Sequence, residues 1–212
     1  MLSWSWTDRL FCAVDNALKT LTIKPLGTGR PMPGADLPET ALTDQARQNV
    51  VGLMRVNHAG EIAAQALYQG QALVAQRPAL YEFLTDAGRQ EADHLRWTQE
   101  RLAELNAKPS LLAPLWYAGA FCLGLGAARL GDGVSLGFLS ETERQVEAHL
   151  KSHLTQLPED DQRSRTIVHQ MMQDEMAHGQ SAREQGGRPL PGWAQAAMRQ
   201  SAKVMTSTAY YV

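Results

Sequence analysis

Two copies of the pattern Glu-x-x-His constrain the fold of this chain more than any other feature. They occupy residues 91–94 and 175–178. Residues three apart on an α-helix share one face, so each copy places a carboxylate and an imidazole within reach of the same metal ion. Each copy therefore predicts a helix that supplies half of a metal site.

A lone glutamate precedes each copy at nearly the same distance. Glu61 lies 30 residues before Glu91, and Glu143 lies 32 residues before Glu175. Four-helix carboxylate proteins that hold two metal ions use this ligand set, with one Glu from each of two helices and Glu-x-x-His from each of the other two. The expected metal ligands are Glu61, Glu91, His94, Glu143, Glu175 and His178.

The expected turns support this pairing. In an antiparallel helical hairpin, residues at the same height are equidistant from the turn, so the midpoint of a matched pair should lie in that turn. The first pair of glutamates has its midpoint at residue 76 and the second pair at residue 159, and a proline stands within two residues of each. Proline marks helix ends, so both halves of the site should face each other at mid-height.

Some choices around the site stay open at this point. Glu141 and Glu147 are alternatives to Glu143, because spacing alone does not separate them. Tyr68 lies seven residues after Glu61, on the same helical face, and is a candidate catalytic residue. Carboxylates and imidazoles suit two ferrous or manganous ions, whereas structural zinc sites prefer thiolates or a closed tetrahedron.

Helical periodicity runs through most of the chain. It predicts helices at 43–76, 79–106, 110–129, 133–156, 160–185 and 192–206, and β-branched runs bounded by turns are missing, so an all-α fold is expected. The Pro- and Gly-rich stretch before residue 40 reads as a linker. We therefore divide the chain into an N-terminal segment, 1–40, and a main domain, 41–212.

Two further segments are apolar. Residues 109–128 contain no charged side chain and are long enough to be a transmembrane candidate. A crossing there would separate the two halves of the metal site, so we expect this segment to return along the bundle, either buried against it or a second subunit, or in a membrane interface. The N-terminal segment predicts a short amphipathic helix that docks on the core or lies on a bilayer, with docking preferred; its apolar residues are Trp4, Trp6, Leu10, Phe11, Val14, Leu18 and Leu21.

Charge and cysteine content exclude other classes. The formal net charge of −2, without a basic run, gives no reason to expect nucleic acid as a partner. Cys12 and Cys122 form no Cys-x-x-Cys pair, so neither a zinc knot nor a disulfide framework is indicated. The N-terminus lacks the basic start of a signal peptide, so secretion is not expected.

Several strings of residues together resemble a known family. They are Arg55-Val-Asn-His-Ala-Gly-Glu61, Glu91-Ala-Asp-His-Leu95, Ala113-Pro-Leu-Trp116, Glu143 and Asp174-Glu175-Met-Ala-His178. Over about residues 45–210 the chain resembles the demethoxyubiquinone hydroxylases of ubiquinone biosynthesis, the Coq7-type di-iron monooxygenases. The resemblance implies a ferritin-like four-helix bundle with an apolar crossover helix and a C-terminal helix.

The resemblance also implies a reaction. Such an enzyme hydroxylates the ring of a demethoxyubiquinone or demethoxyubiquinol precursor, using O2, two iron ions that change between Fe2+ and Fe3+, and electrons from NADH or the quinol itself. His149 falls where the family has a histidine near the iron ligands that is thought to help move electrons or protons. The alternative for His149 is an ordinary surface position.

The implied substrate is a polyprenyl quinone that resides in the bilayer. We therefore expect a peripheral enzyme on the cytoplasmic face of a bacterial inner membrane, as a homo-oligomer or with other ubiquinone-biosynthesis proteins. Two competing functions remain: a ferritin-like ferroxidase or iron-storage protein, which should form a soluble cage, and a non-enzymatic lipid-carrying helical protein.

Overall fold

The computed structural model describes residues 6–22 and 26–212, without the side chains of Trp6 and Arg9. The described residues form helices and no strands, which confirms the predicted all-α class. Each helix predicted from the sequence is present, with ends that differ by at most three residues from the expected ones. The helices are α1 (Trp6–Thr22), α2 (Asp44–Val74), α3 (Pro78–Glu104), α4 (Ala113–Arg129), α5 (Asp132–Gln156), α6 (Gln162–Glu184) and α7 (Gly192–Ala209).

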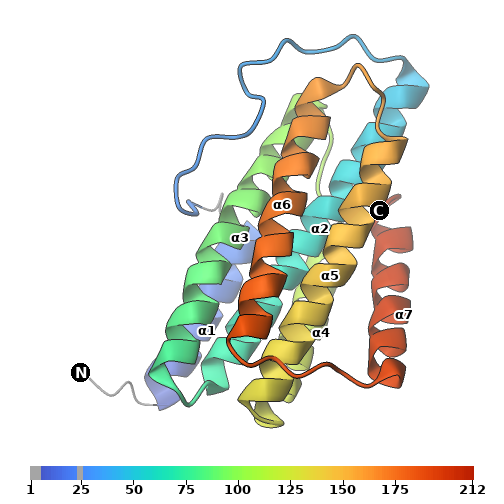
Figure 1. Cartoon of the computed structure of the whole chain (residues 1–212). Helices are drawn as coiled ribbons and strands as arrows, with labels where there is room; N and C mark the ends of the chain where they lie inside the picture. The colour runs from blue at the N-terminus through green and yellow to red at the C-terminus, as the bar shows by residue number, and fades with distance from the viewer. Residues whose placement is uncertain (1–5, 23–25) are drawn as a thin grey trace.

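Four long helices, α2, α3, α5 and α6, form an antiparallel bundle (Figure 1). α2 packs against α3 and α5 against α6, while α3 faces α6 and α2 faces α5. The turns between 74 and 78 and between 156 and 162 include residues 76 and 159, as predicted. The ferritin-like arrangement of the bundle is thereby confirmed.

Local residues explain where these helices begin. The Thr43 hydroxyl accepts a hydrogen bond from the Ala46 N–H at 3.2 Å, and the Asp161 carboxylate accepts one from the Ser164 N–H at 3.1 Å. Such caps satisfy amide groups that have no partner within the helix. Pro78 opens α3, where its missing N–H removes no helical hydrogen bond. The residue at which each helix begins determines how far along the bundle its later residues lie.

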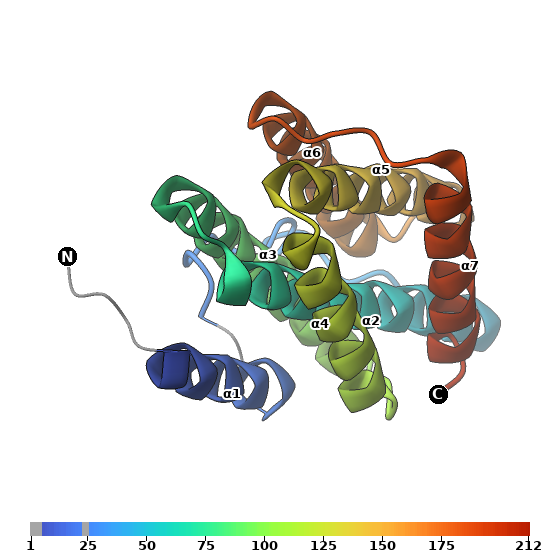
Figure 2. The same ribbon diagram turned by 90° about the horizontal axis from the view of Figure 1, so that it is seen from below.

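α4 lies across the outside of α2 (Figure 2). Gly70 of α2 and Gly124 of α4 stand where the two helices touch, and a Cβ at either position would overlap a backbone carbonyl of the other helix. The segment 109–128 thus returns along the bundle, and both halves of the chain stay together. Among the described residues, no helix combines the length and the apolar character needed to span a membrane.

α1 docks on the bundle by one side only. Ala17 and Leu21 pack against an apolar cluster that includes Ile62 of α2 and Tyr117 of α4. Other apolar residues of α1 are exposed, with Leu10, Phe11, Val14 and Leu18 between 41% and 74% exposed. α1 therefore docks on the bundle and still leaves several apolar side chains exposed. Trp4 lies outside the described residues.

Residues 26–42, which we call the strap, run along the outside of α3 and α6 (Figure 1). The Arg163 guanidinium of α6 donates to the backbone carbonyls of Ala35 and Leu37 at 3.0 and 2.6 Å. Glu39 forms an ion pair with Arg101, whose side chain is fully buried, at 2.7 Å. The predicted linker is thus bound to the bundle over much of its length.

Apolar clusters fill the bundle above and below its middle. One is built mainly from Val50, Leu53, Met54, Trp97, Leu102, Leu105, Leu150, Leu157, Ile167, Val168 and Met171. The other is built from Leu67, Tyr68, Ala72, Ala75, Leu80, Leu84, Ala87, Leu136, Leu139 and Ala182. Between them lies a layer of buried carboxylates and imidazoles. Burying such groups is costly unless they are paired or bind a metal, so this layer is the candidate site.

Candidate metal centre

The structure brings all six predicted ligands to the middle of the bundle. α2 contributes one glutamate, α3 and α6 each contribute a Glu-x-x-His pair, and α5 contributes the remaining glutamate. None of the six residues is more than 7% exposed. They are Glu61, Glu91, His94, Glu143, Glu175 and His178.

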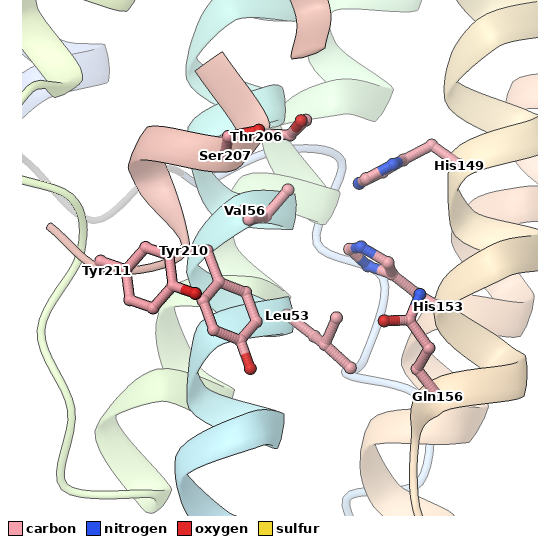
Figure 3. Close-up of a pocket in the computed structure, with 9 residues that line it drawn as sticks. All are labelled: Leu53, Val56, His149, His153, Gln156, Thr206, Ser207, Tyr210 and Tyr211. Carbon is pink, nitrogen blue, oxygen red and sulfur yellow. The ribbon is translucent and has the colours of Figure 1, made fainter. Parts of the chain in front are cut away.

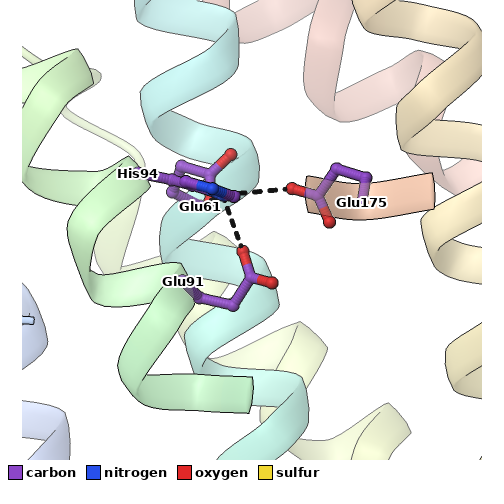
Figure 4. Close-up of side chains that lie close together, drawn as sticks. All are labelled: Glu61, Glu91, His94 and Glu175. Atoms are coloured by element: carbon purple, nitrogen blue, oxygen red, sulfur yellow. Dashed lines mark hydrogen bonds and ion pairs between the residues drawn. The ribbon is translucent and has the colours of Figure 1, made fainter. Parts of the chain in front are cut away.

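His94 is surrounded by three of the carboxylates (Figure 4). Its Nδ1 atom lies 3.6 Å from Glu61, 3.2 Å from Glu91 and 3.2 Å from Glu175. One ligand atom from each of these four residues lies within 4.8 Å of the others. That spacing is compact enough for a metal ion to contact several of them at once.

His178 extends the cluster on the other side. Its Nδ1 atom lies 2.7 Å from Glu91 and 3.6 Å from Glu175, so both of these glutamates approach both histidines. Glu143 completes this half, because its carboxyl group lies beside Glu175 and accepts a hydrogen bond from the Tyr68 hydroxyl at 2.7 Å. Tyr68 therefore contacts a candidate ligand.

The structure separates the alternatives to Glu143. Glu141 faces away from the cluster and accepts hydrogen bonds from Arg144 at 2.7 and 2.8 Å. Glu147 makes none of the contacts described above for the cluster, whereas Glu143 is 2% exposed and lies beside Glu175. The resulting donor set is four carboxylates and two imidazoles.

Two residues that sequence reasoning did not single out hold the outer nitrogens of the histidines. Asp174 lies 2.9 Å from Nε2 of His94, and the Gln90 side-chain oxygen lies 3.1 Å from Nε2 of His178. Both directly precede the glutamate of a motif, and each reaches across to the histidine of the other motif. Such partners orient a ligating imidazole and leave its Nδ1 free for a metal.

The strap adds a further contact on the His94 side. Arg30 donates to Asp174 at 2.8 Å and to the buried carboxylate of Asp93 at 3.3 Å. It thereby links α3 to α6 beside the centre. The sequence pattern could not predict this contact, because Arg30 lies 144 positions from Asp174.

The donor atoms fit a metal better than they fit one another. Glu61 Oε2, Glu91 Oε1, Glu175 Oε2 and His178 Nδ1 are buried and make no hydrogen bond of good geometry among the described residues, although each lies within 3.6 Å of an oppositely charged group of the cluster. Buried polar atoms rarely lack a well-aligned hydrogen bond, and a cation placed between these four atoms would satisfy all of them. Hard oxygen donors combined with imidazole suit iron or manganese.

Protonation of the metal-free cluster follows from burial and charge. Burial raises the pKa of Glu61 and of Glu143 well above their ordinary values. Burial alone would lower the pKa of His178, but Glu91 and Glu175 outweigh it and raise that pKa to about 10. Binding of divalent metal would therefore displace protons from the site.

Comparison with known proteins agrees with this geometry. Residues 48–209 match the model of the family described as ubiquinone biosynthesis protein COQ7. The chain belongs to the COQ7 family.

Curated relatives of this family match nearly the whole chain. A 3-demethoxyubiquinol 3-hydroxylase of Dechloromonas aromatica is 53% identical over 203 residues, which cover 96% of this chain and 98% of the relative. Proteins with the same name from Nitrosomonas eutropha and a Janthinobacterium species are 53% and 54% identical over 205 residues, covering 97% of this chain and 98% of each relative.

In this COQ7-family chain, His149 lies on another side of α5 from Glu143. It lines a cavity of about 350 Å³ between α2, α5 and α7, together with His153 (Figure 3). The two rings are 4.0 Å apart between centroids. None of the contacts described above for the six ligands involves His149, so the structure does not bring it together with them.

Proposed function

We propose that this chain is a di-iron monooxygenase that hydroxylates 3-demethoxyubiquinol in ubiquinone biosynthesis. The observation that carries the proposal is the buried cluster of four carboxylates and two imidazoles inside a COQ7-family chain. The names of the close relatives favour ring hydroxylation over iron storage.

The contacts support a division of the ligands between two iron positions. Glu61 and His94 would hold one iron, and Glu143 and His178 would hold the other. Glu91 and Glu175 would be within reach of both ions, because each of them approaches both histidines. Four carboxylates then balance the charge of two ferrous ions, which removes the like-charge repulsion of the empty cluster.

When bound, the iron pair would reduce O2 so that one oxygen atom enters the ring and the other leaves as water, which requires two electrons and two protons. We propose NADH as the source of the electrons. The residues of the chain hold the site in place: Asp174 and Gln90 orient the imidazoles, and the Tyr68 hydroxyl holds its proton against Glu143. The apolar clusters at both ends keep bulk water out.

Substitution of one candidate ligand tests the proposal. Glu175→Ala should reduce iron below two per chain and abolish accumulation of the hydroxylated quinone in cells that depend on this protein. Glu184→Ala, an exposed position on the same helix, should change neither quantity. Continued hydroxylation by the Glu175→Ala protein would refute the proposed mechanism.

We further propose that the protein attaches peripherally to the cytoplasmic face of the bacterial inner membrane through α1 and α4. These helices contact each other, and both carry exposed apolar residues. On α4 and its ends, Leu111, Leu115, Leu123 and Leu130 are between 54% and 78% exposed. Such a surface suits an interfacial contact and gives access to a polyprenyl quinone.

Membrane attachment has its own test. Leu115→Asp combined with Leu123→Asp should move the protein from the membrane fraction to the soluble fraction, because charges are costly at a lipid interface. Tyr81→Asp on α3, which is 43% exposed, serves as the control and should leave the distribution unchanged. An unchanged distribution of the double variant would refute attachment through α4.

A further inference from the structure

A cavity of about 430 Å³ opens between α3 and α6 and ends at the metal centre. Glu82 and Asp86, both exposed, lie in its outer part, one turn apart on α3, and Asp86 also forms an ion pair with exposed Arg89 of the same helix. Gln90 and His178 line its inner part. The same cavity thus contains two surface carboxylates and one candidate iron ligand.

This cavity is the open half of an otherwise covered face. Beside His94, the strap closes the α3–α6 face, because Arg30 links Asp93 of α3 to Asp174 of α6. The opposite face of the bundle, between α2 and α5, is covered by α4 and α7. None of the described residues that line the cavity belongs to the strap. The strap therefore does not close the half of the α3–α6 face beside His178.

The ligand that lines the cavity is also the most accessible one. His178 is 7% exposed, whereas the other five candidate ligands are at most 3% exposed. Its Nε2 atom is held by Gln90 at 3.1 Å, and its Nδ1 atom faces Glu91 at 2.7 Å. An ion that passes Gln90 therefore reaches a ligand of the centre directly.

The lining indicates what would pass. Beyond the two carboxylates come the amides of Gln90 and Gln185 and the hydroxyl of Ser181, and no lysine or arginine is among the described residues that line the cavity. The rest of the wall is apolar and consists of Ala79, Phe83, Ala87 and Ala177. Carboxylates followed by neutral oxygen donors attract a hydrated divalent cation and exchange its water step by step. An apolar quinone tail finds its matching surface on α1 and α4 instead.

We propose that this cavity is the port through which ferrous ions reach the metal centre. The inference rests on the proposed two-iron centre and adds a route to it. Glu82 and Asp86 collect the cation, and Gln90 stands between the port and the His178 position.

The first experiment removes the charge of the port. Metal-free full-length protein is mixed with ferrous ions, and iron binding is followed by stopped-flow absorbance. Glu82→Gln with Asp86→Asn should slow loading by about tenfold at low salt, with two irons per chain at the end, because steering by local charge accelerates association by roughly 10-fold or more. Added salt should slow the wild type and leave this variant nearly unaffected.

A matched variant controls for total charge. Glu159→Gln with Asp160→Asn makes the same change in net charge at the exposed α5–α6 turn and should load at the wild-type rate. If both double variants slow loading equally, or neither does, the cavity has no special role and the inference is overturned.

The second experiment blocks the port. Ala177→Phe places a large side chain in the cavity wall and should slow both iron loading and iron release to a chelator by about tenfold or more, while Gln180→Phe, exposed on the same helix outside the cavity, should slow neither. Wild-type rates for Ala177→Phe would overturn the route. These experiments measure iron binding, whereas the proposed function is tested by formation of the hydroxylated quinol. If the wild-type protein bound iron through the port but did not hydroxylate the quinol, the proposed function would be refuted and the port would not.

Discussion

Two pairs of histidines lie inside the same bundle and have opposite protonation. His94 and His178 have ring centroids 6.4 Å apart and are surrounded by carboxylates. His149 and His153 are 4.0 Å apart and have no acidic partner among their described contacts. Burial lowers the pKa of His153 to about 3, whereas the carboxylates raise that of His178 to about 10.

The difference shows what makes a metal site in a helical bundle. Burial by itself pushes the pKa of every imidazole downward, and it acts on both pairs. Only the carboxylates, which arrive at the same height from four helices, reverse that effect and supply charge for a cation. A buried histidine pair is therefore weak evidence for metal, and the matched glutamates are strong evidence.

The largest expected effect comes from making the same substitution in each pair. His178→Gln should weaken iron binding by more than about 100-fold at one position, because even the loss of a partner behind a ligand costs about 10–100-fold. His149→Gln should keep two irons per chain, as measured by metal analysis of purified protein.

The His149 variant also tests the role that the family resemblance implies. A fall in hydroxylation with both irons retained is the result that this role predicts. Loss of iron from His149→Gln would instead contradict the separation of the two histidine pairs.

A smaller effect is expected from changing the partner of His94. Asp174→Asn gives His94 a neutral amide partner, the same kind that Gln90 provides for His178. Ferrous titration should show binding weakened by about 10–100-fold at one of the two positions. Equal affinity in the variant and the wild type would mean that the negative charge behind His94 has no influence on the metal.

The second pair predicts a dependence of stability on pH. Folded protein keeps His153 neutral, whereas the unfolded chain takes up a proton below about pH 6.5. Its folded pKa is lowered to about 3, so acid destabilises the fold as pH falls from about 6.5 towards that value. Each pH unit in this range costs about 1.4 kcal/mol in the free energy of unfolding.

Urea unfolding at pH 7.5 and pH 5 measures this effect. Wild-type protein should lose about 2 kcal/mol more stability on acidification than His153→Gln does. The ligands of the metal centre are the same in both proteins, so their titration cancels in the comparison. Equal losses would show that His153 is already protonated in the folded state.

The smallest effect compares two tyrosine hydroxyls. Tyr68 donates to Glu143 at 2.7 Å, and Tyr210 in the wall of the His149 cavity donates to Asn49 at 2.8 Å. Tyr68→Phe should weaken iron binding about fivefold, the equivalent of about 1 kcal/mol for one hydrogen bond. Tyr210→Phe should leave iron affinity unchanged in the same titration, and a matching loss in both would point to a general effect on packing.

Much of the fold could be predicted from spacing within the chain. The two motifs, their upstream glutamates and the prolines between them are local signals, and the structure brings those six residues together at one height. Partners of the ligands were harder to foresee. Asp174 and Gln90 act on the histidine of the opposite motif, so their role depends on how α3 and α6 face each other.

Contacts of the strap could not be derived from its sequence. A Pro- and Gly-rich stretch has no periodicity that would indicate which face it covers, and the position of Arg30 depends on Asp93 and Asp174, 63 and 144 residues away. His149 was ambiguous for a different reason. Its spacing from Glu143 already placed it off the ligand face of the helix, and the structure shows the cavity that it lines.

The close crossing at Gly70 and Gly124 has a practical consequence for handling this protein. It fixes α4 against α2 with Leu115 and Leu123 turned outward, 59% and 54% exposed. In plain aqueous buffer these leucines can be covered only by other protein molecules. An oligomer observed without detergent would therefore reflect association through these leucines in the purification buffer. Sedimentation should be compared with and without a mild detergent before any stoichiometry is assigned.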